Sequence, residues 1–414
     1  MRRKCMVYTA VLSLTMLCLA AGCKKGGEDN RTEEPTKAPV ISGEVVGTEK
    51  EEPEGYETYA EARGLAEKVA AGKLAPIEER LPGKEEIYEE TEFVVGTYSD
   101  DVQFAVETSN PLAKDLVTEG LFRLGEDGSI LPNVAKDYTV NEDFTKYTVY
   151  LRKGLRWSDG VMFTADDCVF FYNKLCLPET FGETLWSCFT VKDEQGKIGK
   201  AVFTKLDDYS FEVLFPSPKP DFLTLLLEHG GVCFAPEHYH VNLLPEYMGA
   251  DAAAAKAKDM GFDDTAEMLQ KTVTDAWNMP GVPTLNSFVI SEEEDINDVK
   301  GEYYEFVRNP FYWKVDKKGQ QLPYLDRLGF TRISGEDQKM LLTTEGFLGV
   351  SILKSEQIEE AKAGAERGGY CVYTWTDALS YAVKTELKNF PENCPDEAAV
   401  RGIGAARVEL WYLE

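Results

Sequence analysis

The sequence predicts a mixed α/β fold with more than one lobe, and three observations lead to that prediction. Short strand-like and helix-like segments are interspersed without strict alternation, and no internal repeat is present. The chain has 414 residues, and at about 150 residues per domain this length suggests two or three domains. Hydrophobic residues make up 43% and aromatic residues 11% of the chain, a globular composition that excludes wholesale disorder.

Acidic residues far outnumber basic ones. There are 72 Asp and Glu residues against 44 Lys and Arg residues, for a formal net charge of −28. Most of the chain therefore lacks the basic face that neutralises phosphates, and no nucleic-acid partner is expected. The same excess argues against docking on anionic lipid through a polybasic surface, so any membrane attachment should be covalent or hydrophobic.

Residues 1–22 have the organisation of an export signal. Arg2, Arg3 and Lys4 form a basic start, residues 6–19 are mostly apolar, and small residues precede Cys23. This pattern is typical of a lipoprotein signal peptide, which is cut before the cysteine whose sulfur carries diacylglycerol. We therefore expect an exported protein that is anchored to the cell membrane, at the extracellular face or in the periplasm, through lipidation of Cys23. The alternatives are an ordinary cleaved secretory signal and an uncleaved anchor, for which the apolar run is short.

A polar tether separates this signal from the folded body. Residues 23–55 are rich in Glu, Lys, Gly, Pro and Thr and are predicted to be disordered. Residues 56–71 carry apolar and small side chains at helical spacing, and Gly72 ends the predicted helix. Residues 71–82 are expected to form an extended arm punctuated by proline.

Local patterns predict the elements of the body. Thr164 and Asp167 have the spacing of a capping box, so a helix with an apolar stripe should begin there. A polar turn at residues 141–143 joins two β-rich runs and indicates a hairpin. The expected strands are residues 93–95 (buried), 138–140, 147–151, 210–215, 286–290, 303–308 and 329–333. Further helices are expected at residues 222–227 and 251–270.

Few residues support catalytic or metal chemistry. The three histidines, His229, His238 and His240, lie close to Cys233, and such a cluster is able to bind zinc or nickel. No fourth ligand has motif spacing, so neither a metal site nor a cofactor is predicted. The nucleophile elbow, the P-loop, the H-E-x-x-H motif and the EF-hand loop do not occur, and no catalytic residue is assigned.

Cysteine and aromatic residues are assigned structural roles. Export permits disulfides, but the spacings show no paired framework, so no obligatory bridge is predicted. The cysteines that remain after Cys23 are Cys168, Cys176, Cys188, Cys233, Cys371 and Cys394. Aromatic clusters at residues 303–304, 311–313 and 373–375 suit core packing better than ligand stacking, because large aromatic side chains bury most of their area.

Several sequence stretches resemble one protein family. Residues 147–160 (YTVYLRKGLRWSDG) and 163–170 (FTADDCVF) closely resemble the signature of the family 5 extracellular solute-binding proteins. Residues 309–313 (NPFYW) with 321–326 (QLPYLD) match a second family stretch, and residues 206–213 (LDDYSFEV) match a third. The resemblance covers about residues 56–388, in order and at the expected intervals. These proteins are the oligopeptide, dipeptide and nickel receptors of ABC importers.

The resemblance implies a fold, a function and a domain organisation. The fold would be periplasmic-binding-protein-like and two-lobed, of the type II, three-subdomain variety, with a ligand held in the cleft between lobes and no catalysis. Residues 1–22 would be the signal peptide, 23–55 the tether, 56–390 the first lobe with its inserted subdomain, and 391–414 the start of an incomplete second lobe. Family members continue beyond this point, so a truncated copy is expected. The partners would be an oligopeptide or similar small solute and ABC permease subunits, with the receptor itself a monomer.

Four residues are candidate ligand contacts by analogy with the family. They are Asn110 after an early strand, Asn286 at the crossing between lobes, and Thr374 and Trp375 on the strand that leads to the other lobe. The family often has a Gly-Thr-Gly-Pro-Tyr-like crossing where this chain has Asn286 and Ser287. The alternative functions are a surface lipoprotein that binds carbohydrate or a partner protein without transport, and a secreted glycosidase.

Overall fold

The computed structural model describes the chain from residue 56 onwards, with gaps. The described residues are 56–106, 111–125, 128–177, 186–193, 195–228, 231–292, 303–376, 379–395 and 402–414. The chain divides into two compact units, Met1–Glu51 and Glu52–Glu414, and every described residue belongs to the second. The predicted signal peptide and tether lie outside the described residues, as do Cys23, Asn110 and His229.

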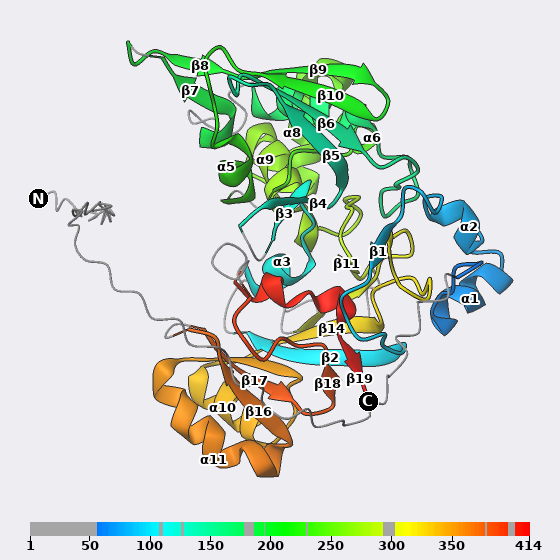
Figure 1. The fold of residues 1–414 in the computed structure, drawn as a ribbon, viewed down its shortest axis with the longest axis vertical. Coiled ribbons are helices and arrows are strands. Elements are labelled where there is room, and N and C mark those ends of the chain that lie inside the picture. Colours follow the sequence, from blue (N-terminus) through cyan, green and yellow to red (C-terminus); the bar gives the residue numbers. More distant parts are fainter. Residues whose placement is uncertain are drawn as a thin grey trace, which may run out of the picture. The chain divides into compact units, whose positions relative to one another are not determined.

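A mixed four-stranded sheet occupies the middle of the described fold (Figure 1). Its strand order is β11 (Phe288–Ile290), β12 (Tyr303–Arg308), β14 (Leu325–Arg332) and β2 (Ser99–Val106). β14 and β2 are parallel, whereas the other neighbours are antiparallel. The Phe104 and Phe330 rings stack across β2 and β14 with centroids 4.8 Å apart. This sheet packs with helix α3 (Pro111–Val117) and with residues near the end of the chain around a shared hydrophobic core.

An antiparallel sheet forms the upper part of the fold in Figure 1. Its strand order is β5 (Ala135–Val140), β6 (Lys146–Leu151), β10 (Ser210–Leu214) and β9 (Val202–Asp207). The predicted hairpin is confirmed as β5 and β6, with Tyr138 opposite Val149. The predicted capping box is confirmed at the start of α4 (Ala165–Phe170), where the Thr164 and Asp167 side chains accept hydrogen bonds from the backbone. The helix continues as one π-helical segment, η1 (Phe171–Cys176).

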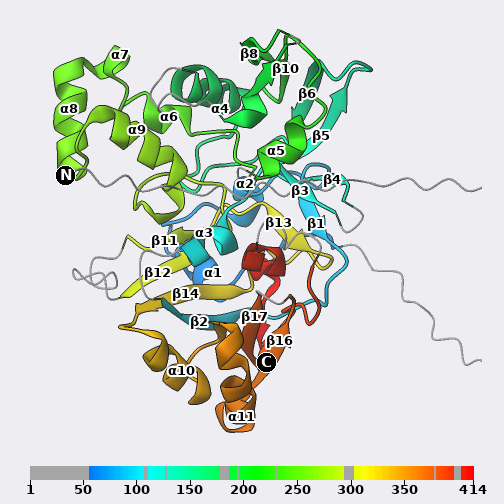
Figure 2. The ribbon, with the colours of Figure 1, turned by 90° about the vertical axis from the view of Figure 1, so that its left-hand side faces the viewer.

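Besides α4, which packs against β9 and β10, further helices lie next to this upper sheet (Figure 2). They are α5 (Phe222–Glu228), α6 (Glu237–His240), α7 (Pro245–Met248), α8 (Ala250–Asp259), α9 (Thr265–Thr274) and the one-turn η4 (Ala276–Asn278). The predicted helix at residues 251–270 is thus two helices, α8 and α9. Gly261, which has a φ of +85°, lies between them. That left-handed conformation suits glycine and ends the first helix.

A smaller sheet with two helices lies at the lower end in Figure 1. Its strand order is β15 (Val350–Leu353), β17 (Ser380–Lys384) and β16 (Tyr370–Thr374), all antiparallel. Helices α10 (Glu336–Thr344) and α11 (Ile358–Gly368) pack on it through a separate cluster that includes Met340, Ala361 and Tyr370. The predicted first-lobe boundary at residue 390 falls after this sheet and stays a prediction.

The segment before the central sheet is fastened to the body by β1 (Tyr88–Glu90), which pairs in parallel with β13 (Lys314–Asp316). It also contains helices α1 (Arg63–Ala70) and α2 (Ile77–Arg80). The extended arm predicted for residues 71–82 is therefore wrong in part, because α2 interrupts it. The Arg80 guanidinium is fully buried and bonds to the Glu61 carboxylate and to the carbonyl of Pro310. The ion pair with Glu61 joins two parts of this segment, and the bond to Pro310 holds the segment against the loop before β13.

Short elements complete the described chain. The strands are β3 (Phe122–Leu124), β4 (Ile130–Pro132), β7 (Thr190–Lys192), β8 (Ile198–Lys200), β18 (Leu387–Lys388) and β19 (Tyr412–Leu413). The one-turn helices are η3 (Ser187–Phe189), η5 (Ser355–Gln357), η6 (Gly402–Ala406) and η7 (Val408–Leu410). The buried strand predicted at residues 93–95 is wrong, because this segment is irregular and Val94 is 66% exposed.

A buried cluster of charges joins four parts of the chain. Lys314 on β13 contacts Glu119, which follows α3, at 3.1 Å and Glu409 in η7 at 3.4 Å. Arg407 contacts Glu409 at 2.7 Å and also pairs with Glu90 on β1. Burial alone would raise the pKa of the Glu409 carboxyl, but Arg407 and Lys314 hold that pKa well below its usual range. These five side chains thus tie the last described segment to the body through paired charges.

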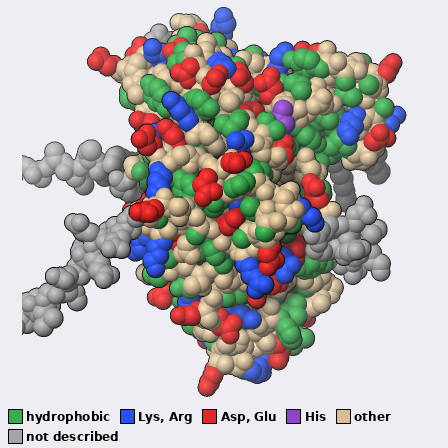
Figure 3. All heavy atoms as spheres, turned by 90° about the vertical axis from the view of Figure 1, so that its right-hand side faces the viewer, with side chains coloured by type: hydrophobic (Ala, Val, Ile, Leu, Met, Phe, Trp, Pro, Cys, Tyr) green, Lys and Arg blue, Asp and Glu red, His purple; other side chains and the backbone are tan. Residues whose placement is uncertain are grey.

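The surface carries interspersed charges. Figure 3 shows acidic and basic side chains mixed over the face that carries α1 and α2. Within the described part of the chain, no helix has the length and apolar character needed to cross a membrane. The six described cysteines are free thiols, of which Cys371 and Cys394 are exposed and the other four are buried.

Candidate functional site

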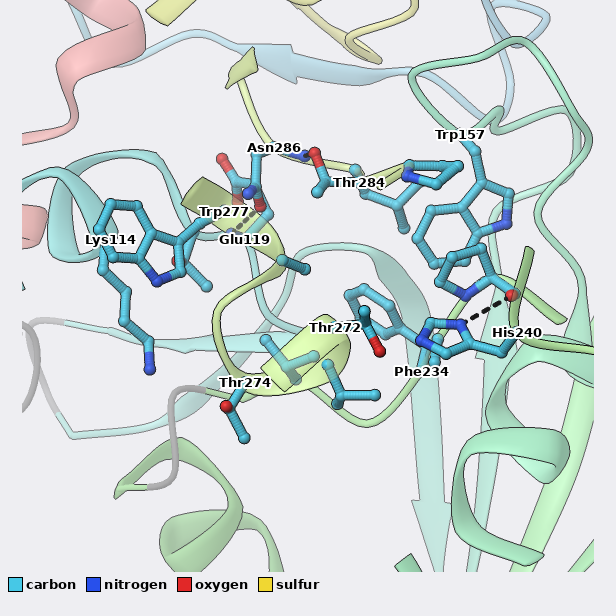
Figure 4. Close-up of a pocket in the computed structure, with 18 of the residues that line it drawn as sticks. Lys114, Glu119, Trp157, Phe234, His240, Thr272, Thr274, Trp277, Thr284 and Asn286 are labelled. Carbon is cyan, nitrogen blue, oxygen red and sulfur yellow. Dashed lines mark hydrogen bonds between the residues drawn. The ribbon is translucent and has the colours of Figure 1, made fainter. Parts of the chain in front are cut away.

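A cavity of about 110 Å³ lies between the upper helices and the segment that leads into β11 (Figure 4). Its lining comes from α3, α6, α9, η4 and the connecting segments, which are far apart in the sequence. Most lining side chains are aromatic, aliphatic or uncharged polar. They are Lys114, Thr118, Glu119, Trp157, Trp186, Val232, Phe234, Ala235, Pro236, His240, Thr272, Val273, Thr274, Ala276, Trp277, Pro283, Thr284, Leu285 and Asn286.

His240 supplies a hydrogen-bond acceptor inside this cavity. The residue is fully buried, and its Nδ1 lies 3.0 Å from the carbonyl oxygen of Pro236. Because a carbonyl oxygen only accepts, Nδ1 carries the proton. Burial lowers the pKa of His240 to about 4, so the ring is neutral at pH 7 and Nε2 presents a lone pair. Nε2 has no hydrogen-bond partner among the described residues, and Figure 4 shows that edge of the ring directed towards Phe234 and Thr272.

Trp277 also lines this cavity. It lies in η4, and its ring stacks on that of Phe306 in β12 with centroids 6.1 Å apart. Its Nε1 is buried and has no hydrogen-bond partner among the described residues. By contrast, Trp157 Nε1 donates to the Asp167 carboxylate at 3.2 Å, so that tryptophan is already satisfied. Among the described residues that line the cavity, His240 thus has a buried acceptor and Trp277 a buried donor without a hydrogen-bond partner.

Asn286, a residue that sequence analysis selected, lines the cavity. It is 6% exposed, and its Oδ1 accepts a hydrogen bond from the Glu119 backbone N–H at 3.1 Å. The Glu119 carboxylate points into the charge cluster, where it accepts bonds from Tyr312 and Lys314. Asn286 thus links the cavity wall to the charge cluster behind it. Contact between Asn286 and a solute stays a prediction.

An open groove of about 540 Å³ adjoins the cavity. Both spaces are lined by Ala276, Trp277, Pro283 and Thr284, so these residues form the boundary between them. The groove continues along β11 and is also lined by Val289, Ile290 and Ser291. Its charged lining residues are Lys68, Asp159 and Glu292. An extended ligand in the groove would therefore have one end next to the cavity.

The β11 strand offers unpaired backbone groups to this groove. β11 is the edge of the central sheet, and it pairs with β12 on one side among the described strands. Ser291 N–H donates to Glu305, and Asn309 N–H donates to Ser287. In this register the residues that bond to β12 are 287, 289 and 291, so the N–H and C=O of Ile290 face away from β12. Such an edge is a template for an added strand.

The other predicted ligand contacts lie away from this site. Thr374 ends β16, and its hydroxyl accepts a bond from Ser380 at 3.3 Å. Trp375 is 7% exposed, packs on Phe390 and Tyr381, and donates from Nε1 to the Pro391 carbonyl at 3.0 Å. Neither residue lines the cavity or the groove. The structure therefore does not bring Thr374 and Trp375 together with Asn286, and their ligand-binding role stays a prediction.

The histidines do not assemble a metal cluster within the described residues. His238 Nε2 lies 2.8 Å from the Asp159 carboxylate at the surface, whereas His240 points into the cavity. Cys233 is buried, and burial raises its pKa well above the usual range. Sequence analysis considered His240 only as a metal ligand and gave no role to Trp277. Pro236 lies four residues before His240, which is the spacing of one helical turn. This spacing was the available sign that one ring nitrogen of His240 bonds to the backbone.

Comparison with known proteins places the chain in a family. Residues 129–383, more than half of the chain, match the model for bacterial extracellular solute-binding proteins, family 5. The periplasmic alpha-galactoside-binding protein of Rhizobium meliloti is 30% identical over 306 residues, which are 66% of this chain and 39% of that protein. The periplasmic oligopeptide-binding protein OppA of Salmonella typhimurium is 33% identical over 124 residues, which are 28% of this chain and 22% of that protein.

Solved structures give the same result. An oligopeptide-binding protein OppA superposes with a TM-score of 0.63 and 26% identity, over 77% of this chain and 49% of that one. The periplasmic binding protein MelB of Agrobacterium fabrum, in complex with stachyose, gives a TM-score of 0.52 and 25% identity, over 75% of this chain and 46% of that one. The chain thus spans less than half the length of each of these proteins.

The fold and the site define a mixed α/β protein with a small cavity and an adjoining groove, which is the layout of a small-molecule receptor. The chain belongs to the family 5 bacterial extracellular solute-binding proteins. The predicted fold class and family are thereby confirmed. The members found here are binding proteins by name, and their names include periplasmic receptors for peptides and for an alpha-galactoside.

Proposed function

We propose that this chain is the solute-capturing component of an ABC importer and that its solute is an oligopeptide bound in extended form along β11. The observation that carries this proposal is the groove beside an unpaired strand edge, with Ile290 backbone groups facing away from β12. Backbone pairing holds a peptide independently of its side chains. The captured peptide would then be delivered to permease subunits.

Export and anchoring are part of the same proposal. The signal pattern of residues 1–22 and the position of Cys23 support a lipid-anchored receptor outside the cytoplasm, with residues 23–55 as its tether. Residues 56–390 would form the first lobe and 391–414 would belong to a second, and the receptor would act as a monomer. Cys23→Ser should move the protein from the membrane fraction to the soluble fraction. Retention of Cys23→Ser in the membrane would contradict lipid anchoring.

A saccharide is the second candidate solute. The observation that favours it is the alpha-galactoside-binding relative, whose similarity extends over 66% of this chain. Sugars are commonly held by aromatic faces and uncharged polar groups, and the cavity lining has both. Under this alternative the ring of Trp277 would be a stacking surface at the boundary between groove and cavity.

Isothermal titration of the full-length protein tests both candidates. The ligands are di- to pentapeptide pools, stachyose, melibiose and Ni²⁺. Peptides should bind and should stabilise the fold, since a ligand at one hundred times its Kd adds about 2.7 kcal/mol. Peptides in which every backbone N–H is methylated are the matched control, because they cannot pair with a strand edge. Binding of stachyose alone would favour the second candidate, and no binding of any ligand would contradict solute capture.

A further inference from the structure

We infer that the 110 Å³ cavity is a subsite for an uncharged, hydroxyl-bearing end group of the solute, which donates a hydrogen bond to Nε2 of His240. Solute entry from the groove rests on the proposed function, whereas the preference of the cavity for a hydroxyl group does not. The chemistry is shared by two sources, the side chain of Ser or Thr in a peptide and the hydroxymethyl group of a saccharide.

The size of the cavity limits the group that enters it. An engineered cavity of about 150 Å³ holds benzene, and this one is smaller, at about 110 Å³. It therefore accommodates an end group of a few heavy atoms rather than a whole ring. A hydroxymethyl or hydroxyethyl group fits this limit.

The open polar atoms determine the chemistry of the group. Nε2 of His240 accepts and does not donate, so its partner must carry a proton. A purely alkyl group would leave this buried acceptor without a partner, which disfavours binding. Nε1–H of Trp277 requires an acceptor in turn. A hydroxyl group is both donor and acceptor, and is thus the simplest group able to satisfy either atom.

The charges near the cavity disfavour ionic groups. The two charged residues in its lining are Lys114, which is exposed, and Glu119, whose carboxylate is held by Lys314 and Asn133. His238 and Asp159 pair with each other at the surface. An ammonium or carboxylate group beside His240 would therefore lose its hydration without gaining a counter-charge. The hydroxyl subsite should reject charged end groups of equal size.

The first experiment observes the acceptor directly. The full-length protein, labelled with ¹⁵N-histidine, has three histidines to assign. We would titrate it with 1-propanol, and with propylammonium and propionate as charged analogues of matched size. The Nε2 resonance of His240 should shift saturably with 1-propanol and not with the charged analogues. No saturable shift, which would indicate a cavity filled by water alone, overturns the inference even if peptides bind in the groove.

The second experiment asks whether the solute uses the subsite. Calorimetry compares Ala-Ala-Ala with tripeptides carrying Ser at each position in turn, and runs melibiose in parallel to distinguish the two sources. The best serine peptide should bind about tenfold more tightly than Ala-Ala-Ala, and in His240→Phe the ratio of the two affinities should fall to about one. Equal affinity of serine and alanine peptides, or an advantage that survives in His240→Phe, overturns the solute role. If that variant does not unfold cooperatively, the Nε2 resonance of His240 in the unsubstituted protein replaces it: the serine peptide should shift this resonance and Ala-Ala-Ala should not, and equal shifts overturn the solute role.

Discussion

His240 and Asp167 are two buried titratable residues of the upper helices with opposite behaviour. Burial lowers the pKa of His240 to about 4 from 6.5. Burial raises the pKa of Asp167 to about 6 from 3.8, although its carboxylate accepts bonds from Trp157, Thr164 and Glu237. Between pH 4 and 6, His240 is protonated in the unfolded chain and neutral in the folded protein. In the same range, Asp167 is ionised in the unfolded chain and protonated in the folded protein. The two contributions to the pH dependence of stability therefore oppose each other.

The first prediction isolates the histidine. As pH falls from 6.5 to 4, the native protein loses about 3 kcal/mol of unfolding free energy through His240, from a pKa difference of 2.5. His240→Phe lacks this loss. We subtract the unfolding free energy of His240→Phe from that of the unsubstituted protein at each pH. This difference should be about 3 kcal/mol smaller at pH 4 than at pH 6.5. Urea titrations at both pH values measure it, and a difference independent of pH would contradict a neutral buried His240.

At the scale of elements, the exposed edge of β11 links fold and function. Ile290 has backbone groups directed away from β12, whereas Val289 bonds to that strand. A proline at position 290 removes an N–H that no described residue uses, and a proline at position 289 removes a bond of the sheet. Proline substitutions at these two adjacent positions therefore distinguish an effect on peptide binding from an effect on stability.

The second prediction uses that contrast. Ile290→Pro should keep the unfolding free energy within about 1 kcal/mol, because no ladder bond is lost, but should abolish peptide binding. Val289→Pro is the matched control and should lower stability by about 1–3 kcal/mol, because it removes a ladder bond and leaves the Val307 carbonyl without its partner. Calorimetry and urea unfolding of both variants provide the measurements. Undiminished peptide binding by Ile290→Pro would show that β11 is not the docking edge.

Elements with strong local signals could be predicted from the sequence, and those set by distant partners could not. The β5–β6 hairpin and the α4 capping box depend on residues within a few positions of each other. β2 was missed because its polar start, Ser99 to Asp101, conceals the strand, which pairs with β14 more than 200 residues away. Residues 93–95 are apolar, but they pair with none of the described strands. Of the cavity lining, sequence analysis selected Asn286 as a ligand contact, since the other residues converge only on folding.

At the scale of the whole molecule, the charge cluster around Lys314 joins the segments carrying β1, α3, β13 and η7. Lys314 is 1% exposed and contacts both Glu119 and Glu409. Removing one partner from a buried ionic cluster leaves charges without compensation, which costs more than the net stabilisation of an intact pair. The cluster should therefore control the cooperativity between the last described segment and the rest of the fold.

The third prediction follows from that arrangement. Lys314→Met should lower the unfolding free energy by about 3–5 kcal/mol and expose the segment at residues 402–414 to proteases. Lys318→Met, at an exposed position in the turn after β13, is the control and should change stability little. Limited proteolysis with mass spectrometry, together with urea unfolding, measures both effects. Equal stability of the two variants would show that the cluster is energetically neutral.

Trp277 lines both the groove and the cavity, so its fluorescence can report solute binding. This indole belongs to the walls of both the groove and the cavity, and the chain has only six tryptophans. A hydroxyl group that accepts from its buried Nε1–H, or a solute that covers its ring, changes the polarity around the fluorophore. Solute arrival should shift the intrinsic emission of the native protein, and Trp277→Phe should lose most of that change. The intrinsic fluorescence would then measure the fraction of receptor with bound solute, without any attached dye.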